Sequence, residues 1–150
     1  MRKALARSGH AEEEVEAAIA RLRQERLLDD ASFAGRFARS RIAHHGLGRH
    51  RVRQALRERG VARSTAEAGL SEALTEVSEG ATLDAVARRY WREHARDEPA
   101  RRLRKLWAAL LRRGFPMGLV HDRLAALWPR HRDALDGLEP PDETTGGSDD

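Results

Sequence analysis

A leucine–glycine frame recurs three times along the chain and constrains the fold more than any other feature of the sequence. Each copy has a leucine followed four residues later by a glycine, as in Leu56 and Gly60. Apolar residues then follow the glycine by six, ten and thirteen positions, as in Ala66, Leu70 and Ala73. Because glycine readily adopts the left-handed conformation that ends many helices, the frame predicts a helix, a tight turn and a second helix.

The other two copies are centred on Gly9 and Gly114, so successive glycines lie 51 and 54 residues apart. A period of this length is typical of helical repeat proteins. Residues 33–37 and 86–90 also resemble each other, which adds one earlier helix to each unit. We therefore predict an all-α fold of tandem three-helix repeats, arranged as an elongated array of helices meeting at right angles. The predicted boundaries are residues 1–28 for an incomplete first repeat, 29–79 for the second, 80–135 for the third and 136–150 for a tail.

Within this scheme we expect one helix over residues 11–24 and a separate helix over residues 31–45. Asp29 or Asp30 would cap the second of these, because acidic residues stabilise the start of a helix. Small, separate cores are expected around a set of large apolar residues at helical spacing. This set comprises Phe33, Phe37, Leu56, Leu70, Val86, Tyr90, Leu106, Leu110 and Leu124.

The formal charge of +4 conceals a strong asymmetry. Residues 136–150 carry six acids and no base, whereas residues 1–135 carry 28 bases and 18 acids, a net charge of +10. A basic body indicates a polyanionic partner or an acidic protein surface. Of the 28 bases only Lys3 and Lys105 are lysines, a composition that a GC-rich genome would also produce. The polar, acidic segment 136–150 is predicted to be disordered.

Two basic helices supply the candidate contact residues. Arg49, Arg53 and Arg57 recur every four residues and would share one helix face. The corresponding helix of the last repeat has its own basic outer face. The complete candidate set is Arg49, Arg51, Arg53, Arg57, Arg101, Arg104, Lys105 and Arg112.

No pattern in the sequence indicates catalysis, a metal or a cofactor. A glycine-rich phosphate loop is missing, there is no cysteine, and His44, His45 and His50 lack metal-ligand spacing. Trp91 and Trp107 lie on apolar helix faces, which favours core packing over base stacking. With no long apolar run, the expected protein is a cytoplasmic monomer that is neither an enzyme nor a membrane protein.

Three strings, at residues 27–34, 48–61 and 110–115, occur in an order and spacing that resemble the RecX family of bacterial recombination regulators. The resemblance covers about residues 3–128. It implies tandem three-helix repeats, binding to the RecA recombinase filament, possible contact with DNA phosphates inside that filament, and inhibition of strand exchange and ATP hydrolysis.

The sequence departs from the family pattern in two respects. Members of the family carry a further helix before the position where this chain begins, so the resemblance implies an N-terminal truncation. The second residue after each repeat glycine is often a serine-type cap in relatives but is Ala11, Ala62 or Pro116 here. A stand-alone helix-turn-helix DNA-binding module is the alternative function, because a basic helix beside a glycine turn also describes such readers.

Overall fold

The structure is a computed structural model that describes residues 11–138. Seven α-helices and one 3₁₀ helix make up this range, and no strand occurs within it. The elements are α2 (Glu12–His45), α3 (Arg49–Glu58), α4 (Arg63–Glu76), α5 (Glu79–Glu93), α6 (Pro99–Arg112), α7 (Met117–Leu127), η1 (Pro129–His131) and α8 (Arg132–Asp136).

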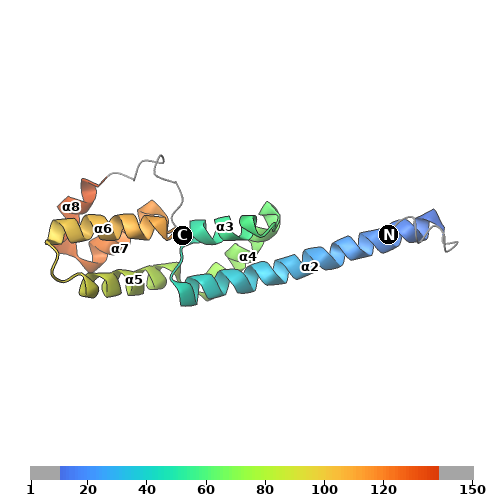
Figure 1. The fold of residues 1–150 in the computed structure, drawn as a ribbon, viewed down its shortest axis with the longest axis horizontal. Coiled ribbons are helices and arrows are strands. Elements are labelled where there is room, and N and C mark those ends of the chain that lie inside the picture. Colours follow the sequence, from blue (N-terminus) through green and yellow to red (C-terminus); the bar gives the residue numbers. More distant parts are fainter. Residues whose placement is uncertain (1–10, 139–150) are drawn as a thin grey trace.

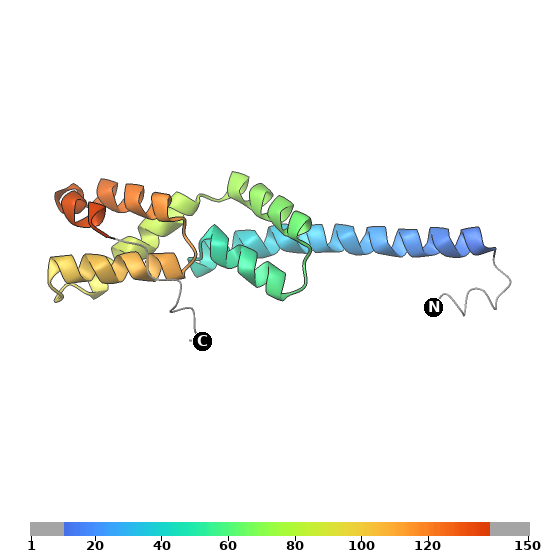
Figure 2. The same ribbon diagram turned by 90° about the horizontal axis from the view of Figure 1, so that it is seen from above.

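The helices form two three-helix units placed end to end along the long axis (Figures 1 and 2). The C-terminal half of α2 packs with α3 and α4 around one core, and α5, α6 and α7 enclose a second. The predicted all-α fold of tandem three-helix repeats is confirmed. Both turns of the repeated frame have the expected geometry, with φ of 79° at Gly60 and 90° at Gly114, while Gly9 lies outside the described residues.

Helix α2 corrects one prediction, because it runs for 34 residues through the break expected between residues 24 and 31. Neither Asp29 nor Asp30 starts a helix there. Residues 25–31 contain no glycine or proline and include Leu, Arg, Glu and Ala, which favour helix, so nothing local interrupts the chain. The boundary expected between residues 28 and 29 therefore falls inside a helix about 51 Å long. Its N-terminal half projects beyond α4 (Figure 1).

Five of the nine predicted core residues are fully buried, namely Leu56, Leu70, Leu106, Leu110 and Leu124. The other four, Phe33, Phe37, Val86 and Tyr90, are only half-buried and lie at the edges of the cores. Phe37 shows the reason, since the guanidinium groups of Arg41 and Arg59 lie 4.9 and 4.6 Å from its ring centre. An aromatic face that binds cations must stay near the surface where the charges are hydrated.

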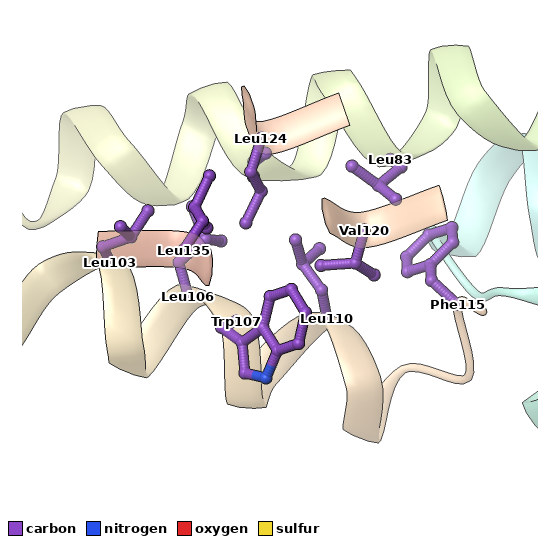
Figure 3. Packing of buried hydrophobic residues seen from close by; sticks show 10 residues of the cluster. Leu83, Leu103, Leu106, Trp107, Leu110, Phe115, Val120, Leu124 and Leu135 are labelled. Atoms are coloured by element: carbon purple, nitrogen blue, oxygen red, sulfur yellow. The ribbon is translucent and has the colours of Figure 1, made fainter. Parts of the chain in front are cut away.

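The second core includes residues beyond α7. Leu135 of α8 joins the leucines of α5, α6 and α7 in this core (Figure 3). Leu138, two residues after the predicted start of the tail, packs against the same cluster. Residues 139–150 of that tail lie outside the described residues. None of the helices between residues 11 and 138 is long and apolar enough to cross a bilayer.

Candidate functional site

The basic helices α6 and α3 meet end to end where the two units join (Figures 1 and 2). The backbone N–H of Gly48 donates to the carbonyl of Arg113 at 2.8 Å, and that of His50 donates to the carbonyl of Gly114 at 3.0 Å. Free N–H groups at the start of α3 are thus satisfied by free carbonyls at the end of α6, with the two helix dipoles head to tail. Together α6 and α3 form one rod that spans both units.

This junction has room only for glycine on both sides. A Cβ atom at Gly48 would overlap the backbone of Gly114 and Phe115, and one at Gly114 would overlap the backbone of Arg51. Gly114 therefore has two roles, because it ends α6 in the left-handed conformation and also allows the close approach of α3. The sequence pattern indicates the first role but not the second.

Glu79, the first residue of α5, also stabilises this junction. It is the one charged side chain that is buried among residues 11–138, with 5% of its surface exposed. Its carboxylate accepts the backbone N–H and the Nε–H of Arg49, both at 2.8 Å, and lies 2.7 Å from Nη2. The carboxylate therefore caps α3 and neutralises Arg49, as a buried charge requires.

The three arginines predicted to share one helix face, Arg49, Arg53 and Arg57, have different surroundings in the structure. Arg49 is held by Glu79, and Arg53 donates through Nε and Nη2 to Glu67 of α4. That hydrogen bond from Arg53 lowers the pKa of the Glu67 carboxyl, against a smaller opposing effect of burial. Arg57 is exposed and forms no ion pair with any described residue.

The remaining candidate cations of the two helices are exposed. Within α3 and α6, five exposed arginines form no ion pair with any described residue, and Lys105 makes only a long contact of 3.7 Å to Asp97. The two helices contain 14 and 10 residues, so the rod is about 36 Å long. We call these six exposed cations the basic ridge; it consists of Arg101, Arg104, Lys105 and Arg112 of α6 with Arg51 and Arg57 of α3.

Other candidate chemistries find less support in the described part of the chain. Trp107 is buried, and Trp91 stacks on Trp128 at 4.5 Å between ring centres with the Arg102 guanidinium 3.8 Å from its ring. These rings are therefore packed against the protein's own side chains. From residue 11 to residue 138, no group of three or more His, Asp or Glu side chains is placed to hold a metal ion.

Comparison with known proteins explains the two units. The family model of the second three-helix domain of RecX matches residues 29–70, and that of the third matches residues 78–122. The regulatory protein RecX of Prosthecochloris aestuarii is 34% identical over 85% of this chain and 81% of its own length. The chain belongs to the RecX family. The basic ridge thus crosses from one RecX domain to the next, since α3 lies in the second domain and α6 in the third.

Further RecX proteins match over a smaller share of their length. The regulatory protein RecX of Thermobifida fusca is 35% identical over 79% of this chain and 63% of its own. A crystal structure of a regulatory protein RecX superimposes with a TM-score of 0.57 and 26% identity, over 81% of this chain and 61% of that one. The chain therefore spans somewhat less than two thirds of these two relatives.

Proposed function

We propose that this RecX-family protein binds the RecA–DNA filament through its basic ridge and inhibits strand exchange and ATP hydrolysis. The observation that carries the proposal is the hydrogen-bonded end-to-end arrangement of α6 and α3, which displays six exposed cations across two RecX domains. The protein would act as a cytoplasmic monomer, by occupying the filament surface and without chemistry of its own.

A rod suits a helical filament because the filament repeats the same surface at regular intervals. A single exposed ion pair contributes less than about 1 kcal/mol, so no one arginine of the ridge should be essential. Several such contacts, carried by two helices of one chain, combine because each one raises the effective concentration of the next. The acidic groups that the ridge meets would be carboxylates of RecA protomers, or DNA phosphates within the filament.

The test is RecA-driven, DNA-dependent ATP hydrolysis, titrated with wild type and two triple variants. The ridge variant is Arg51→Glu, Arg104→Glu and Arg112→Glu. The matched control is Arg88→Glu, Arg92→Glu and Arg96→Glu, on and just after α5. All six arginines are exposed and free of ion pairs with described residues, and both variants change the net charge equally. Wild type and control should inhibit alike, whereas the ridge variant should need at least about tenfold more protein.

Each outcome separates one part of the proposal from another. Hydrolysis that is untouched by excess wild type would contradict the inhibitory function. Equal inhibition by wild type and the ridge variant would leave the function standing and remove the ridge as its surface. Sequence-selective binding to bare duplex DNA would favour the helix-turn-helix alternative. Arg49 and Arg53 are left unchanged because reversing them would also break their pairs with Glu79 and Glu67.

A further inference from the structure

The end of the described chain lies next to one helix of the basic ridge. Leu135 belongs to the same packed cluster as Leu103 and Leu106 of α6 (Figure 3). Leu138, the last described residue, is partly buried against that cluster. Leu138 is thus held against the core of this unit, and the face of α6 turned away from that core carries Arg101, Lys105 and Arg112.

The composition of residues 139–150 complements the ridge. This segment has no Lys, Arg or His and no large apolar side chain, so it offers a partner only charge and hydrogen bonds. Against the six cations of the ridge it carries five carboxylate side chains. These belong to Glu139, Asp142, Glu143, Asp149 and Asp150.

The length of the segment is sufficient to cover the ridge. Twelve residues reach at most about 40 Å when fully extended, and a flexible chain of that length spans about 20 Å on average. The rod itself is about 36 Å long. Because the segment follows directly on the residues packed against this core, its effective concentration at the ridge is on the order of millimolar.

We propose that residues 139–150 dock on the basic ridge and act as an intramolecular competitor for its anionic partner. The inference rests on the ridge being the binding surface of the proposed function. An anionic partner must then displace the segment before it reaches the arginines. A surface that presents many carboxylates or phosphates at once would displace the segment, whereas an isolated anion would not. The segment therefore raises the selectivity of the ridge for polyanions over single anions.

The direct test compares backbone amide NMR spectra of the full chain with and without charge on the segment. The segment variant is Asp142→Asn, Glu143→Gln, Asp149→Asn and Asp150→Asn. The matched control removes the same number of charges from exposed positions of α2: Glu12→Gln, Glu13→Gln, Glu25→Gln and Asp29→Asn. The segment variant should shift the amides of ridge residues at low salt, the control should not, and high salt should abolish the difference.

A second measurement gives the effect on binding, with a fluorescently labelled oligothymidylate as the polyanionic probe. The segment variant should bind about three- to tenfold more tightly than the control at low salt, with a difference that disappears at high salt. Equal affinities would overturn the proposal. The proposal would also fail if the segment variant left the NMR shifts of the ridge amides unchanged, or if the shifts fell on α2 instead. Ridge shifts that fade on dilution would overturn it too, because they would report contact between molecules. Neither measurement contains RecA. The inhibitory function can therefore fail while the contact between segment and ridge is confirmed, and the contact can fail while the inhibitory function is confirmed.

Discussion

The two units of this protein have the same helix arrangement but very different cores. The unit of α2, α3 and α4 combines five larger buried residues with many small ones. The larger ones are Ile42, Val52, Leu56, Val61 and Leu70, and the small ones are Ala34, Ala38, Ala66 and Ala73 with the glycines Gly35 and Gly69. The unit of α5, α6 and α7 is built from large ones. Its buried set is Leu83, Leu103, Leu106, Trp107, Leu110, Phe115, Val120, Leu124 and Leu135, with Ala87 as the one small member.

This difference shows that the same repeat frame permits two kinds of helix packing: close backbone contact between small residues, and burial of large side chains. A Cβ atom at Gly69 would lie 2.6 Å from Cβ of Ala34 and 2.8 Å from the backbone nitrogen of Gly35, so α2 and α4 touch almost backbone to backbone. Small side chains bury little apolar area each, whereas each buried leucine contributes about 1.5–3 kcal/mol. We expect the leucine-rich unit to be the more stable half and the alanine-rich unit to tolerate added volume poorly.

Removing volume from the leucine-rich unit should have the largest effect. Leu110 is fully buried in its centre, so Leu110→Ala should lower the free energy of unfolding by about 2–5 kcal/mol through lost burial and the cavity left behind. Leu22→Ala, on the projecting part of α2 where 43% of the leucine is exposed, is the control and should cost far less. Urea unfolding measures both. An unchanged midpoint for Leu110→Ala would show that the core assignment is wrong.

Adding volume to the alanine-rich unit should have the next largest effect on stability. There, alanine should be less favourable than glycine, the opposite of their usual order in a helix. Glycine to alanine inside a helix normally stabilises by up to about 1 kcal/mol. Gly69→Ala should instead destabilise by about 1–3 kcal/mol, because the new methyl group overlaps Ala34 and the α2 backbone. Gly118→Ala in α7, where a Cβ meets nothing within 4 Å, should be neutral or stabilising. Thermal melts in which both changes stabilise would refute the backbone-contact packing.

The junction provides a smaller effect that sharpens the comparison. Glu79→Gln keeps the shape of the side chain but leaves the Arg49 guanidinium without its buried counter-charge, at a cost of about 1–3 kcal/mol. The two units should then unfold less cooperatively, and amide exchange should quicken first in the alanine-rich unit. Glu93→Gln removes only an exposed contact to Arg89 and is expected to change nothing measurable. Uniform exchange in both units after Glu79→Gln would show that the junction does not couple them.

The sequence correctly predicted the features that depend on residues close to each other in the chain. The frame around Gly60 and Gly114 correctly predicted both helix–turn–helix pairs, because its glycines and leucines lie within about twenty residues of each other. The continuity of α2 was missed, since the Leu27–Asp30 string resembles a capping sequence although it contains no helix-breaking residue. Physical context, here the absence of glycine and proline, is the better guide to that segment.

The rest of the site depends on contacts that are distant in sequence. Gly48 meets Gly114, and Arg49 meets Glu79 across 30 residues, so no local pattern marks either pair. The four-residue period of Arg49, Arg53 and Arg57 indicated a shared face but not which neighbour that face meets. Packing turns Arg49 and Arg53 toward acids, so of the arginines predicted on this helix only Arg51 and Arg57 stay exposed and free of ion pairs with described residues.

Cosedimentation with RecA filaments assembled on single-stranded DNA tests the central claim most directly, because it measures binding without relying on an enzymatic readout. The wild-type protein and the α5 control variant should pellet with the filament to the same extent. The variant Arg51→Glu, Arg104→Glu, Arg112→Glu should remain in the supernatant at the same salt concentration, since it reverses charge along the ridge while leaving both cores and the junction intact. Equal pelleting of the ridge variant and wild type would contradict the claim that the α6–α3 rod is the filament-binding surface.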